Sequence, residues 1–272
     1  MNDPFEKLYK KWNSGNNSEK YQNIPAFPEA IEVELTNRCN LQCPFCQNGA
    51  GKITKKQGFM RKSTFMKIIK EIRITKTPIR CARFGEPMLN PKFWEFVALA
   101  KYYDIPIHLV TNGHYFDDHA VECANFYKLD SIKISIHEDS NAVMDAVKRL
   151  ERLKFTHTHV SITTDERGLD IYDAAKVDKK SRLKTYWKGI TYPRPSCCSE
   201  ALNKLSVNWD GSVSACCTDF NDEMLVGNLK DNTLKEIWEG PKMKGYQRLI
   251  AEDLHWTLPL CSECYDLSLR DK

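Results

Sequence analysis

Three cysteines that lie close together are the residues of this chain best suited to chemistry. Cys39, Cys43 and Cys46 fall within eight residues. Three thiolates at this spacing can hold one face of an iron–sulfur cubane and leave its fourth iron without a protein ligand. A catalytic metal needs such an open position. A zinc site is the alternative, but it would need a fourth ligand close by, and no Cys or His lies between residues 47 and 80.

The last third of the chain holds a second group of four cysteines. They are Cys198, Cys216, Cys261 and Cys264. Four thiolates suit either a second [4Fe–4S] cluster or a zinc ion. Cys197 and Cys217 are adjacent to two of them and are alternative ligands.

The cysteine content points to metal binding rather than to disulfide bonds. The chain has 272 residues and 11 cysteines, and its polar, lysine-rich N-terminus has no apolar segment of the kind found in secretory signals. We therefore expect a cytoplasmic protein, in which thiols stay reduced and clustered cysteines bind metal. The isolated Cys81 and Cys123 lie among apolar residues, and we expect both to be buried.

Composition and charge are those of an ordinary globular protein. The chain is 42% hydrophobic and 28% charged. No apolar run approaches the roughly 18 residues that a membrane span needs, so we expect no membrane partner. The net charge of +4 is mild, and Lys and Arg are spread along the chain. The charge therefore does not by itself indicate a nucleic acid partner.

Short apolar runs that alternate with helical patterns predict an α/β fold. The predicted strands are Ile31–Leu35, Ile79–Phe84, Ile107–Thr111, Ile132–Ile136 and Val160–Thr163, with a sixth near Ile190. Apolar stripes that include Phe65, Phe96 and Val147 predict helices between them. Repeated strand–helix–strand units imply a parallel sheet with right-handed crossovers. We expect an open or partial barrel with functional groups at the C-terminal ends of its strands.

A charged stretch over residues 165–184, followed by Pro193 and Pro195, indicates a domain boundary. Beyond it, apolar and polar residues alternate on both sides of Asp210–Gly211, which predicts a β-hairpin. A helix over about 233–238 and then a loop are expected to follow. We expect an N-terminal extension over residues 1–28, a first domain over 29–192 and a second over 193–272.

The first cysteine group resembles the signature of the radical S-adenosylmethionine (SAM) superfamily. Its spacing is C-x3-C-x2-C, and an aromatic residue, Phe45, precedes the last cysteine. Phe84-Gly85-Glu86-Pro87 closes the second predicted strand and is similar to the Gly-Gly-Glu-Pro element of that family, which binds the amino group of SAM. Phe84 departs from the first glycine of that pattern. Because the element acts through backbone groups and the acidic Glu86, the resemblance still implies that Gly85, Glu86 and Pro87 contact SAM.

The ends of the third and fourth predicted strands extend this resemblance. Thr111-Asn112-Gly113 and Ser135-Ile136-His137 stand where the family places contacts to the carboxylate and ribose of SAM. The resemblance implies that Asn112, Ser135 and His137 bind SAM, and that Cys39, Cys43 and Cys46 hold the catalytic [4Fe–4S] cluster. In such enzymes an electron from a partner such as flavodoxin or ferredoxin cleaves SAM. The 5′-deoxyadenosyl radical that forms then abstracts a hydrogen atom from the substrate.

The second cysteine group resembles the SPASM/Twitch auxiliary domains of the same superfamily. Trp209-Asp210-Gly211, Gly227-Asn228-Leu229 and a closing C-x2-C pair carry the likeness. A full SPASM segment has three more cysteines after that pair and none follows Cys264 here, so the resemblance implies the shorter Twitch form with one auxiliary [4Fe–4S] cluster. The spacing to Gly211 favours Cys198 and Cys216 as ligands beside the closing pair. With four cysteine ligands, this cluster is expected to serve in electron transfer or structural support.

The resemblance covers about residues 28–268 and implies a partial (β/α)6 barrel followed by a small Twitch-like domain with a β-hairpin and a helix. Gaps of 17, 44 and 2 residues between the auxiliary cysteines resemble those of the aminocyclitol dehydrogenase of the butirosin pathway. This likeness favours oxidation of a small polyol or sugar-like metabolite. The alternatives are radical modification of a ribosomal peptide, modification or rearrangement of a nucleotide or nucleic acid, and a non-enzymatic protein that binds clusters or zinc. Residues 1–28 are too few for the leader-binding domain of many peptide maturases.

Overall fold

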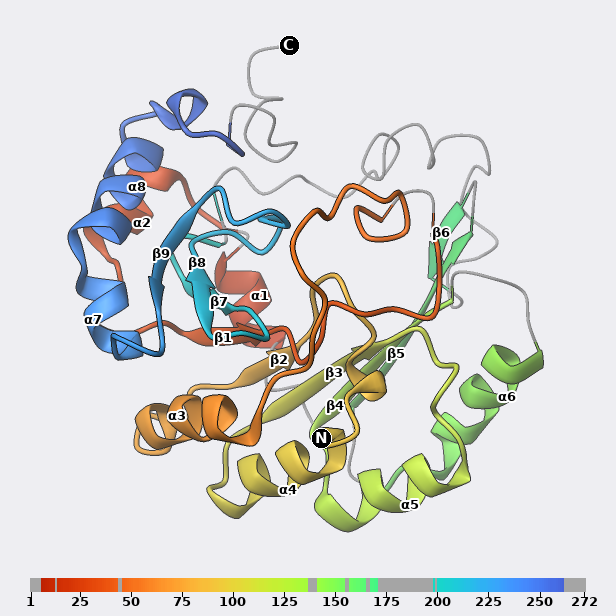
Figure 1. The fold of residues 1–272 in the computed structure, drawn as a ribbon. Helices are drawn as coiled ribbons and strands as arrows, with labels where there is room; N and C mark the ends of the chain where they lie inside the picture. Colours follow the sequence, from red (N-terminus) through yellow and green to blue (C-terminus); the bar gives the residue numbers. More distant parts are fainter. Residues whose placement is uncertain are drawn as a thin grey trace.

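A nine-stranded mixed sheet runs through the structure in the order β6-β5-β4-β3-β2-β1-β7-β8-β9 (Figure 1). The computed structural model describes residues 6–12, 14–43, 46–136, 141–154, 157–164, 167–170, 198 and 200–261. The proposed boundary between residues 192 and 193 lies outside these ranges.

Five parallel strands form the first part of the sheet, as predicted. They are β1 (Ala30–Val33), β2 (Ile79–Cys81), β3 (Ile107–Thr111), β4 (Ser131–Ile136) and β5 (His157–Thr164). A short strand that was not predicted, β6 (Arg167–Asp170), pairs antiparallel with β5 at the edge. The strand predicted near Ile190 lies outside the described residues. The α/β fold with a sheet of mainly parallel strands is thus confirmed.

Four helices cover one face of these strands (Figure 1). They are α3 (Lys62–Ile72), α4 (Phe93–Tyr102), α5 (Asp118–Tyr127) and α6 (Asn141–Arg149). The apolar stripes predicted α3, α4 and α6. Helix α5 was missed because its buried side is made mainly of small residues, Ala120, Val121 and Ala124, which give a weak apolar stripe.

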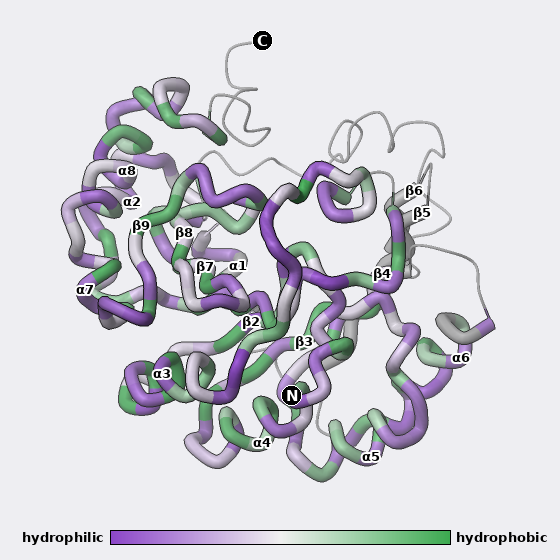
Figure 2. Tube along the Cα trace, viewed as in Figure 1, coloured by the Kyte–Doolittle hydropathy of each residue, from purple (hydrophilic) through white to green (hydrophobic). Residues whose placement is uncertain are grey.

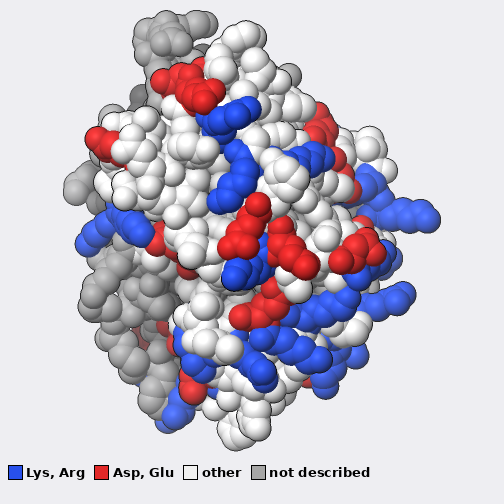
Figure 3. Space-filling view, turned by 90° about the vertical axis from the view of Figure 1, so that its left-hand side faces the viewer, with Lys and Arg blue, Asp and Glu red and all other residues white. Residues whose placement is uncertain are grey.

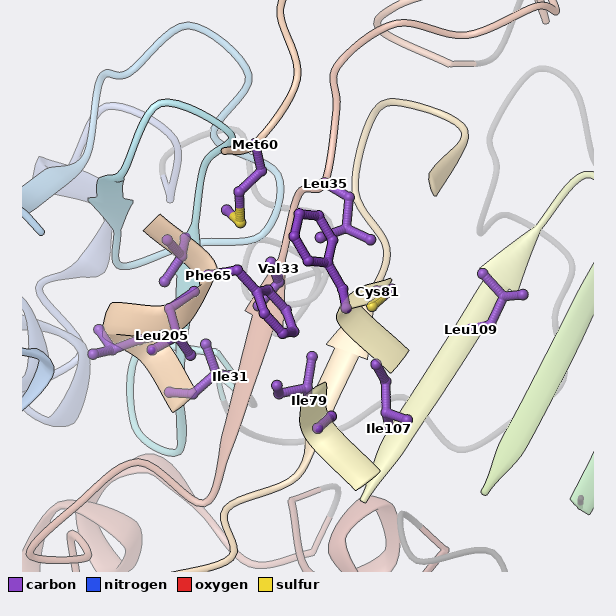
Figure 4. Close-up of a cluster of buried hydrophobic side chains, with 14 of the residues drawn as sticks. Ile31, Val33, Leu35, Met60, Phe65, Ile79, Cys81, Ile107, Leu109 and Leu205 are labelled. Carbon is purple, nitrogen blue, oxygen red and sulfur yellow. The ribbon is translucent and has the colours of Figure 1, made fainter. Parts of the chain in front are cut away.

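The apolar core lies between the helices and the strand face that they cover (Figure 4). Ile31, Val33 and Leu35 alternate along the chain with polar residues, so their side chains share this face, and all three are buried. The prediction that Cys81 is buried is confirmed, since its exposed fraction is 0%. The same prediction is wrong for Cys123, which is partly exposed on α5 beside His119.

The opposite face of the sheet carries a row of polar side chains. The strand register places Glu32 of β1 next to Arg80 of β2, then His108 of β3 and Ser131 of β4. Arg80 Nη1 lies 3.1 Å from Glu32 Oε1, and His108 Nδ1 lies 2.5 Å from Ser131 Oγ. Buried polar groups require hydrogen-bond or ion-pair partners. These contacts supply such partners, so polar side chains can be buried on the sheet face opposite the helices.

The segment that carries the second cysteine group extends the same sheet. β7 (Lys204–Val207) pairs in parallel with β1, and β8 (Ser212–Ser214) and β9 (Leu225–Asn228) follow as antiparallel strands. The predicted hairpin turn at Asp210–Gly211 joins β7 to β8, and Gly211 has a φ of 91°, which glycine adopts readily. The parallel pairing with β1 was not predicted. It places the hairpin directly beside the strand that leads to Cys39.

Two helices follow the hairpin. α7 (Leu234–Glu239) begins after Thr233, which forms a capping box with Glu236, and confirms the predicted helix. α8 (Pro241–Ala251) occupies a region where a loop was predicted, so that expectation is wrong. Gly245 in its middle weakens the helical signal in the sequence. Pro241 is compatible with the first turn of a helix, and burial of the side of α8 that carries Met243 and Ile250 stabilises it.

The N-terminal helices α1 (Glu6–Trp12) and α2 (Asn17–Gln22) lie close to the hairpin and α8 (Figure 1). Trp238 Nε1 of α7 donates to the Pro25 carbonyl at 2.8 Å, and Cys198 N–H donates to Asn17 Oδ1 at 2.7 Å. Short 3-10 turns occur at Pro87–Leu89, Leu150–Arg152 and His255–Thr257. Within the described residues, no helix has the length and apolar character needed to cross a bilayer.

Hydropathy and charge follow this architecture. Much of β2 and β3 consists of hydrophobic residues, whereas the long connection after β1 is mostly hydrophilic (Figure 2). On the face that carries α7 and α8, acidic and basic side chains are intermixed, with Lys and Arg more numerous toward the lower edge (Figure 3). The polar connection after β1 holds the first cysteine group.

Candidate functional site

The connection between β1 and α3 carries the first three cysteines. The N–H of Cys46 donates to the Cys43 carbonyl at 3.0 Å, so the chain turns back on itself between these residues. Gly49 packs against this turn, since a Cβ at this position would lie 2.3 Å from the Cys43 carbonyl oxygen. Cys39, Cys43 and Cys46 are all half-buried and form no disulfide bond within the described residues, and the loop therefore presents three thiols beside the end of β1.

Two asparagines fix this loop. Asn37 donates to the Lys56 carbonyl and accepts from the N–H of Gly58, both at 2.9 Å, which closes the loop at its base. Asn48 Nδ2 donates to the carbonyl of Asn37 at 2.9 Å and to that of Phe84 at 2.8 Å. Asn48 thus joins the cysteine loop to the segment after β2. Sequence reasoning missed it because an asparagine in a polar loop is indistinguishable from a solvated one.

Gly85 is a close-approach glycine. A Cβ at this position would lie 2.0 Å from the Thr36 carbonyl oxygen and 2.8 Å from that of Arg38. The N–H of Glu86 donates to the Arg38 carbonyl at 2.9 Å. The segment after β2 is therefore in direct contact with the backbone that enters the cysteine loop, and only glycine allows this approach.

Glu86 is a buried carboxylate held by three donors. Its Oε1 accepts from Thr111 Oγ1 at 2.8 Å and from the N–H of Met88 at 3.0 Å, and its Oε2 accepts from the N–H of Asn112 at 2.8 Å. Burial raises the pKa of Glu86 to about 7 and outweighs the three hydrogen bonds, which lower it. Glu86 thus joins the ends of β2 and β3, a role that the sequence did not predict. Its contact with the amino group of SAM stays a prediction.

The other predicted SAM contacts that are described lie at neighbouring strand ends. Asn112 Nδ2 donates to Asn40 Oδ1 at 2.9 Å and lies 3.9 Å from Cys39 Sγ, so the end of β3 contacts the cysteine loop. Ser135 is buried near the end of β4, and Pro87 is buried after β2. The predicted residues Phe45 and His137 lie outside the described residues.

The three thiols fit an iron–sulfur cubane better than a zinc ion. Within the part of the chain that the structure describes, one set of three His, Cys, Asp or Glu residues has all its ligand atoms within 4.8 Å of one another. That set is Glu32, Glu200 and Cys217, and it does not include the three cysteines of the loop. The sulfurs of Cys39, Cys43 and Cys46 are therefore more widely spread. A tetrahedral zinc ion with Zn–S bonds of about 2.3 Å would need its sulfurs about 3.8 Å apart. A cubane, which bridges wider sulfurs and leaves one iron open, suits this loop.

Three of the predicted auxiliary cysteines lie near one another. Burial raises the pKa of Cys198, and the nearby thiols of Cys216 and Cys261 raise it further. Cys217 donates a hydrogen bond to Cys216, which lowers the pKa of Cys216. By the spacing argument used above, these three sulfurs also fit a cubane. The choice of Cys216 over Cys217 stays a prediction, and Cys197 and Cys264 lie outside the described residues.

Glu32, Glu200 and Cys217 form the set whose ligand atoms all lie within 4.8 Å of one another. Two cations already face this set. Lys204 forms an ion pair with Glu200, and Arg80 forms one with Glu32. The two positive charges balance the two carboxylates, so this cluster has no excess negative charge to attract a metal ion. Cys217 therefore lies beside a charge-balanced group of side chains on the polar face of the sheet, next to the hairpin.

Comparison with known families identifies both parts of the chain. Residues 33–159 match the model of the radical SAM superfamily, and residues 197–265 match the SPASM model, described as an iron–sulfur cluster-binding domain. The chain is 22% identical over 250 residues to the S-adenosyl-L-methionine-dependent 2-deoxy-scyllo-inosamine dehydrogenase of Niallia circulans. This match covers 88% of the chain and 94% of the dehydrogenase. The chain is also 26% identical over 130 residues to the PqqA peptide cyclase of Gluconobacter oxydans, covering 47% of the chain and 36% of the cyclase.

Solved structures show the same fold. The structure of BtrN in complex with AdoMet and 2-DOIA matches with a TM-score of 0.66 and 19% identity, covering 88% of this chain and 93% of BtrN. The structure of anSMEcpe with bound AdoMet matches with a TM-score of 0.60 and 17% identity, covering 81% of this chain and 83% of anSMEcpe. Given its two matched domains and the cysteine loop at the strand ends, the chain is a radical SAM enzyme, with a domain that binds a [4Fe–4S] cluster and SAM followed by an iron–sulfur cluster-binding domain.

Proposed function

We propose that this enzyme oxidises a hydroxyl group of a small polyol or sugar-like metabolite. The observation that carries this proposal is the match to the 2-deoxy-scyllo-inosamine dehydrogenase, which extends over 88% of this chain and 94% of that enzyme. The match spans both the barrel and the segment with the auxiliary cysteines. The match to the peptide cyclase covers less than half of either protein, so it supports the shared radical SAM chemistry more than a shared substrate.

The SAM site is proposed at the C-terminal ends of β1 to β4. Cys39, Cys43 and Cys46 would hold the cluster, and the SAM pocket would be lined by Phe45, Gly85, Glu86, Pro87, Asn112, Ser135 and His137. When bound, the cluster and SAM supply a 5′-deoxyadenosyl radical able to remove a hydrogen atom from the substrate. The chain positions the site: Gly85 allows the segment after β2 to contact the cysteine loop, and Glu86 fixes that segment to β3.

The auxiliary cluster is proposed on Cys198, Cys216, Cys261 and Cys264, which together fill four iron positions. The neighbouring cysteines give a direct test. Cys216→Ala should lower the iron content of the anaerobically reconstituted protein by about four atoms, the content of one cubane. Cys217→Ala should leave it unchanged. The reverse result would assign the ligand to Cys217.

We further propose that an external carrier such as flavodoxin or ferredoxin supplies the electron, and that the protein works in the reducing cytoplasm. Omission of the carrier and of any chemical reductant should abolish cleavage of SAM. Formation of 5′-deoxyadenosine without a reductant would contradict this requirement.

The substrate class is tested by isotope transfer. The enzyme is incubated with SAM, a reductant and aminocyclitols or sugars deuterated at single carbinol carbons, and the 5′-deoxyadenosine is analysed by mass spectrometry. Transfer of one deuterium together with formation of the ketone supports the proposal. The Cys39→Ala variant serves as the control without a complete cluster. Deuterium transfer from a peptide or a nucleotide, with none from any polyol, would assign the enzyme to another substrate class.

A further inference from the structure

The segment that follows the auxiliary cysteines, Asp219–Asp222, is fixed to the hairpin at its first residue. The Asp219 carboxylate accepts from Ser214 Oγ at 2.6 Å and from the N–H groups of Glu223 and Met224 at 2.8 and 3.0 Å. Asp219 is fully buried. We call Asp219–Asp222 the coupling segment, because the same residues contact two loops of the radical SAM domain.

The first contact is with the loop that carries Cys39, Cys43 and Cys46. Asn221 Oδ1 accepts from the N–H of Thr54 at 2.9 Å, and Asn221 Nδ2 donates to the Lys52 carbonyl at 3.0 Å. Lys55 Nζ lies 2.9 Å from Asp222 Oδ1, with both side chains largely buried. The C-terminal part of the cysteine loop is thus bound to the coupling segment by two hydrogen bonds, to the amide oxygen and the amide nitrogen of Asn221, and by the ion pair of Lys55 with Asp222.

The second contact is with the loop that carries Gly85 and Glu86. Arg83 Nη2 donates to the Asp219 carbonyl at 2.7 Å, and Arg83 Nε lies 3.7 Å from Glu34 Oε2. The ring of Phe84 meets that of Phe220 edge to face, with centroids 6.0 Å apart. Phe84 is the residue that departs from the Gly-Gly-Glu-Pro pattern, and its ring is used here to contact the coupling segment.

Arg83 has an unfavourable backbone conformation and a buried, incompletely hydrogen-bonded guanidinium group. Its φ of 99° is rare for a residue with a side chain. Its side chain and that of Glu34 are 0% exposed, and Arg83 Nη1 has no hydrogen-bond partner within the described residues. Strained backbone and incompletely paired buried charge persist only where the surrounding structure enforces them. For Arg83, the groups that enforce this state are Glu34 on one side and the Asp219 carbonyl on the other.

We propose that Arg83 is a positioning residue that makes SAM binding depend on the folded state of the loop after β8, which carries Cys216 and Cys217. Asp219 fixes the coupling segment, Arg83 ties that segment to the backbone next to Gly85, and Glu86 extends the connection to Asn112. The inference rests on the proposed function in taking Cys216 as an auxiliary ligand and in placing the SAM pocket beside Gly85, Glu86 and Asn112. Loss of order near Cys216 would release the Asp219 carbonyl, and the SAM pocket would then lose its fixed geometry.

The first experiment removes the guanidinium without leaving a buried charge. Arg83→Met is combined with Glu34→Gln in the full chain, and the anaerobically reconstituted protein is titrated with SAM in a calorimeter. The dissociation constant should rise about tenfold at unchanged iron content. The matched control is Arg38→Met, because Arg38 precedes Cys39 but its exposed side chain lies over the Phe59 ring. An affinity unchanged within twofold in the double variant would overturn the proposal.

The second experiment tests the coupling. Cys216→Ala is introduced into the wild-type chain and into the Arg83→Met/Glu34→Gln chain, and circular dichroism verifies that each protein is folded. SAM binding should weaken about tenfold in the first background and less than twofold in the second, because the connection is already broken there. Hydrogen exchange of the Met88 and Asn112 amides should rise in parallel. Equal losses of affinity in both backgrounds would refute the role of Arg83.

The iron content of the Cys216→Ala protein tests the assignment of Cys216 as a cluster ligand separately from the coupling through Arg83. If Cys216→Ala retained all its iron, the ligand assignment would be wrong and the coupling would be decided by Asp219→Ala instead. That substitution loosens the same loop without changing a cysteine. It should weaken SAM binding about tenfold in the wild-type chain and less than twofold in the Arg83→Met/Glu34→Gln chain, and equal losses would again refute the proposal.

Discussion

The carboxylate of Glu86 accepts a hydrogen bond of 2.8 Å from the backbone N–H of Asn112. These two residues follow different strands, β2 and β3, which the sheet only places side by side. With the bond from Thr111 Oγ1, the contact fixes the relative position of two loops that both reach the cysteine loop. A charged acceptor in a buried position makes strong hydrogen bonds, but it is costly to desolvate.

The raised pKa of Glu86 predicts a pH-dependent stability. Burial raises its pKa from 4.5 to about 7 in the folded protein. Between these values the folded state binds more protons than the unfolded state, so the contribution of Glu86 to stability is largest below pH 4.5 and falls as the pH rises to 7. In Glu86→Gln this loss, about 2 kcal/mol between pH 5.5 and pH 8, should disappear. Urea unfolding of both proteins, followed by tryptophan fluorescence at the two pH values, measures it.

The same substitution should lower stability at pH 5.5. At pH 5.5 Glu86 is protonated in the folded protein, and both of its carboxyl oxygens can still accept hydrogen bonds. The NH2 group of glutamine cannot accept, so one of the three donors would lose its acceptor, and loss of one buried hydrogen bond costs about 1–3 kcal/mol. An equal pH dependence in parent and variant would show that Glu86 does not titrate in this range.

Gly85 provides a steric prediction. In Gly85→Ala the new Cβ would lie 2.0 Å from the Thr36 carbonyl oxygen, and both atoms belong to constrained backbone. The loop must shift, and SAM affinity should fall more than tenfold, which corresponds to about 1.4 kcal/mol or more. Calorimetric titration with SAM measures this loss, and the iron content should stay that of the parent.

Gly245 is the matched control. It lies in the middle of α8, and a Cβ there meets nothing within 4 Å. Gly245→Ala should therefore stabilise the protein by about 0.5–1 kcal/mol through helix propensity and leave SAM binding unchanged. If both alanine variants lost affinity, the effect at Gly85 could not be assigned to its contact with Thr36.

The sequence predicted the parts of the fold that depend on local pattern. The β-branched runs gave the five parallel strands, and Asp210–Gly211 gave the hairpin, because strand periodicity and turn chemistry are local properties. The parallel pairing of β7 with β1 was not predicted, since it joins two strands that are separated by about 170 residues of intervening chain and depends on burial rather than on local pattern. Helix α8 was missed because Gly245 weakens its local signal.

The site divides in the same way. Cysteine spacing drew attention to Cys39, Cys43 and Cys46, because the chemistry of thiols restricts where they occur in clusters. Asn48 and Thr111 had no such signal, since an asparagine or a threonine at a strand end usually meets water. Their roles arise from tertiary contacts, with the Phe84 carbonyl for Asn48 and with Glu86 for Thr111.

Asn48 provides a third prediction. Its amide donates two hydrogen bonds, to the carbonyls of Asn37 and Phe84. Asn48→Asp removes both donors and places a carboxylate against two carbonyl oxygens, so the cysteine loop should separate from the segment after β2. SAM affinity should fall at least tenfold, and the electron paramagnetic resonance spectrum of the reduced protein should no longer change when SAM is added.

Asn125 offers the corresponding control. Its side chain also bridges two backbone groups, donating to the Arg152 carbonyl and accepting from the N–H of Lys154, but it is away from the site. Asn125→Asp should leave SAM affinity within twofold of the parent. A loss of affinity as large as that of Asn48→Asp would indicate a general effect of the added charge rather than the loss of a specific bridge.

Asn17, the first residue of α2, connects that helix to the auxiliary site. Its Oδ1 accepts from the N–H of Cys198 at 2.7 Å, and the side chain is almost fully buried, with an exposed fraction of 2% for the residue. Asn17→Leu keeps the branched shape of the side chain but leaves the partly buried Cys198 N–H without its acceptor, which should cost about 1–3 kcal/mol. Because Cys198 is a proposed ligand, iron of the auxiliary cluster should be released to a chelator several times faster than in the parent. Asn23→Leu, at the exposed end of the same helix, should release iron at the parental rate. Equal release rates in the two variants would separate Asn17 from the auxiliary site.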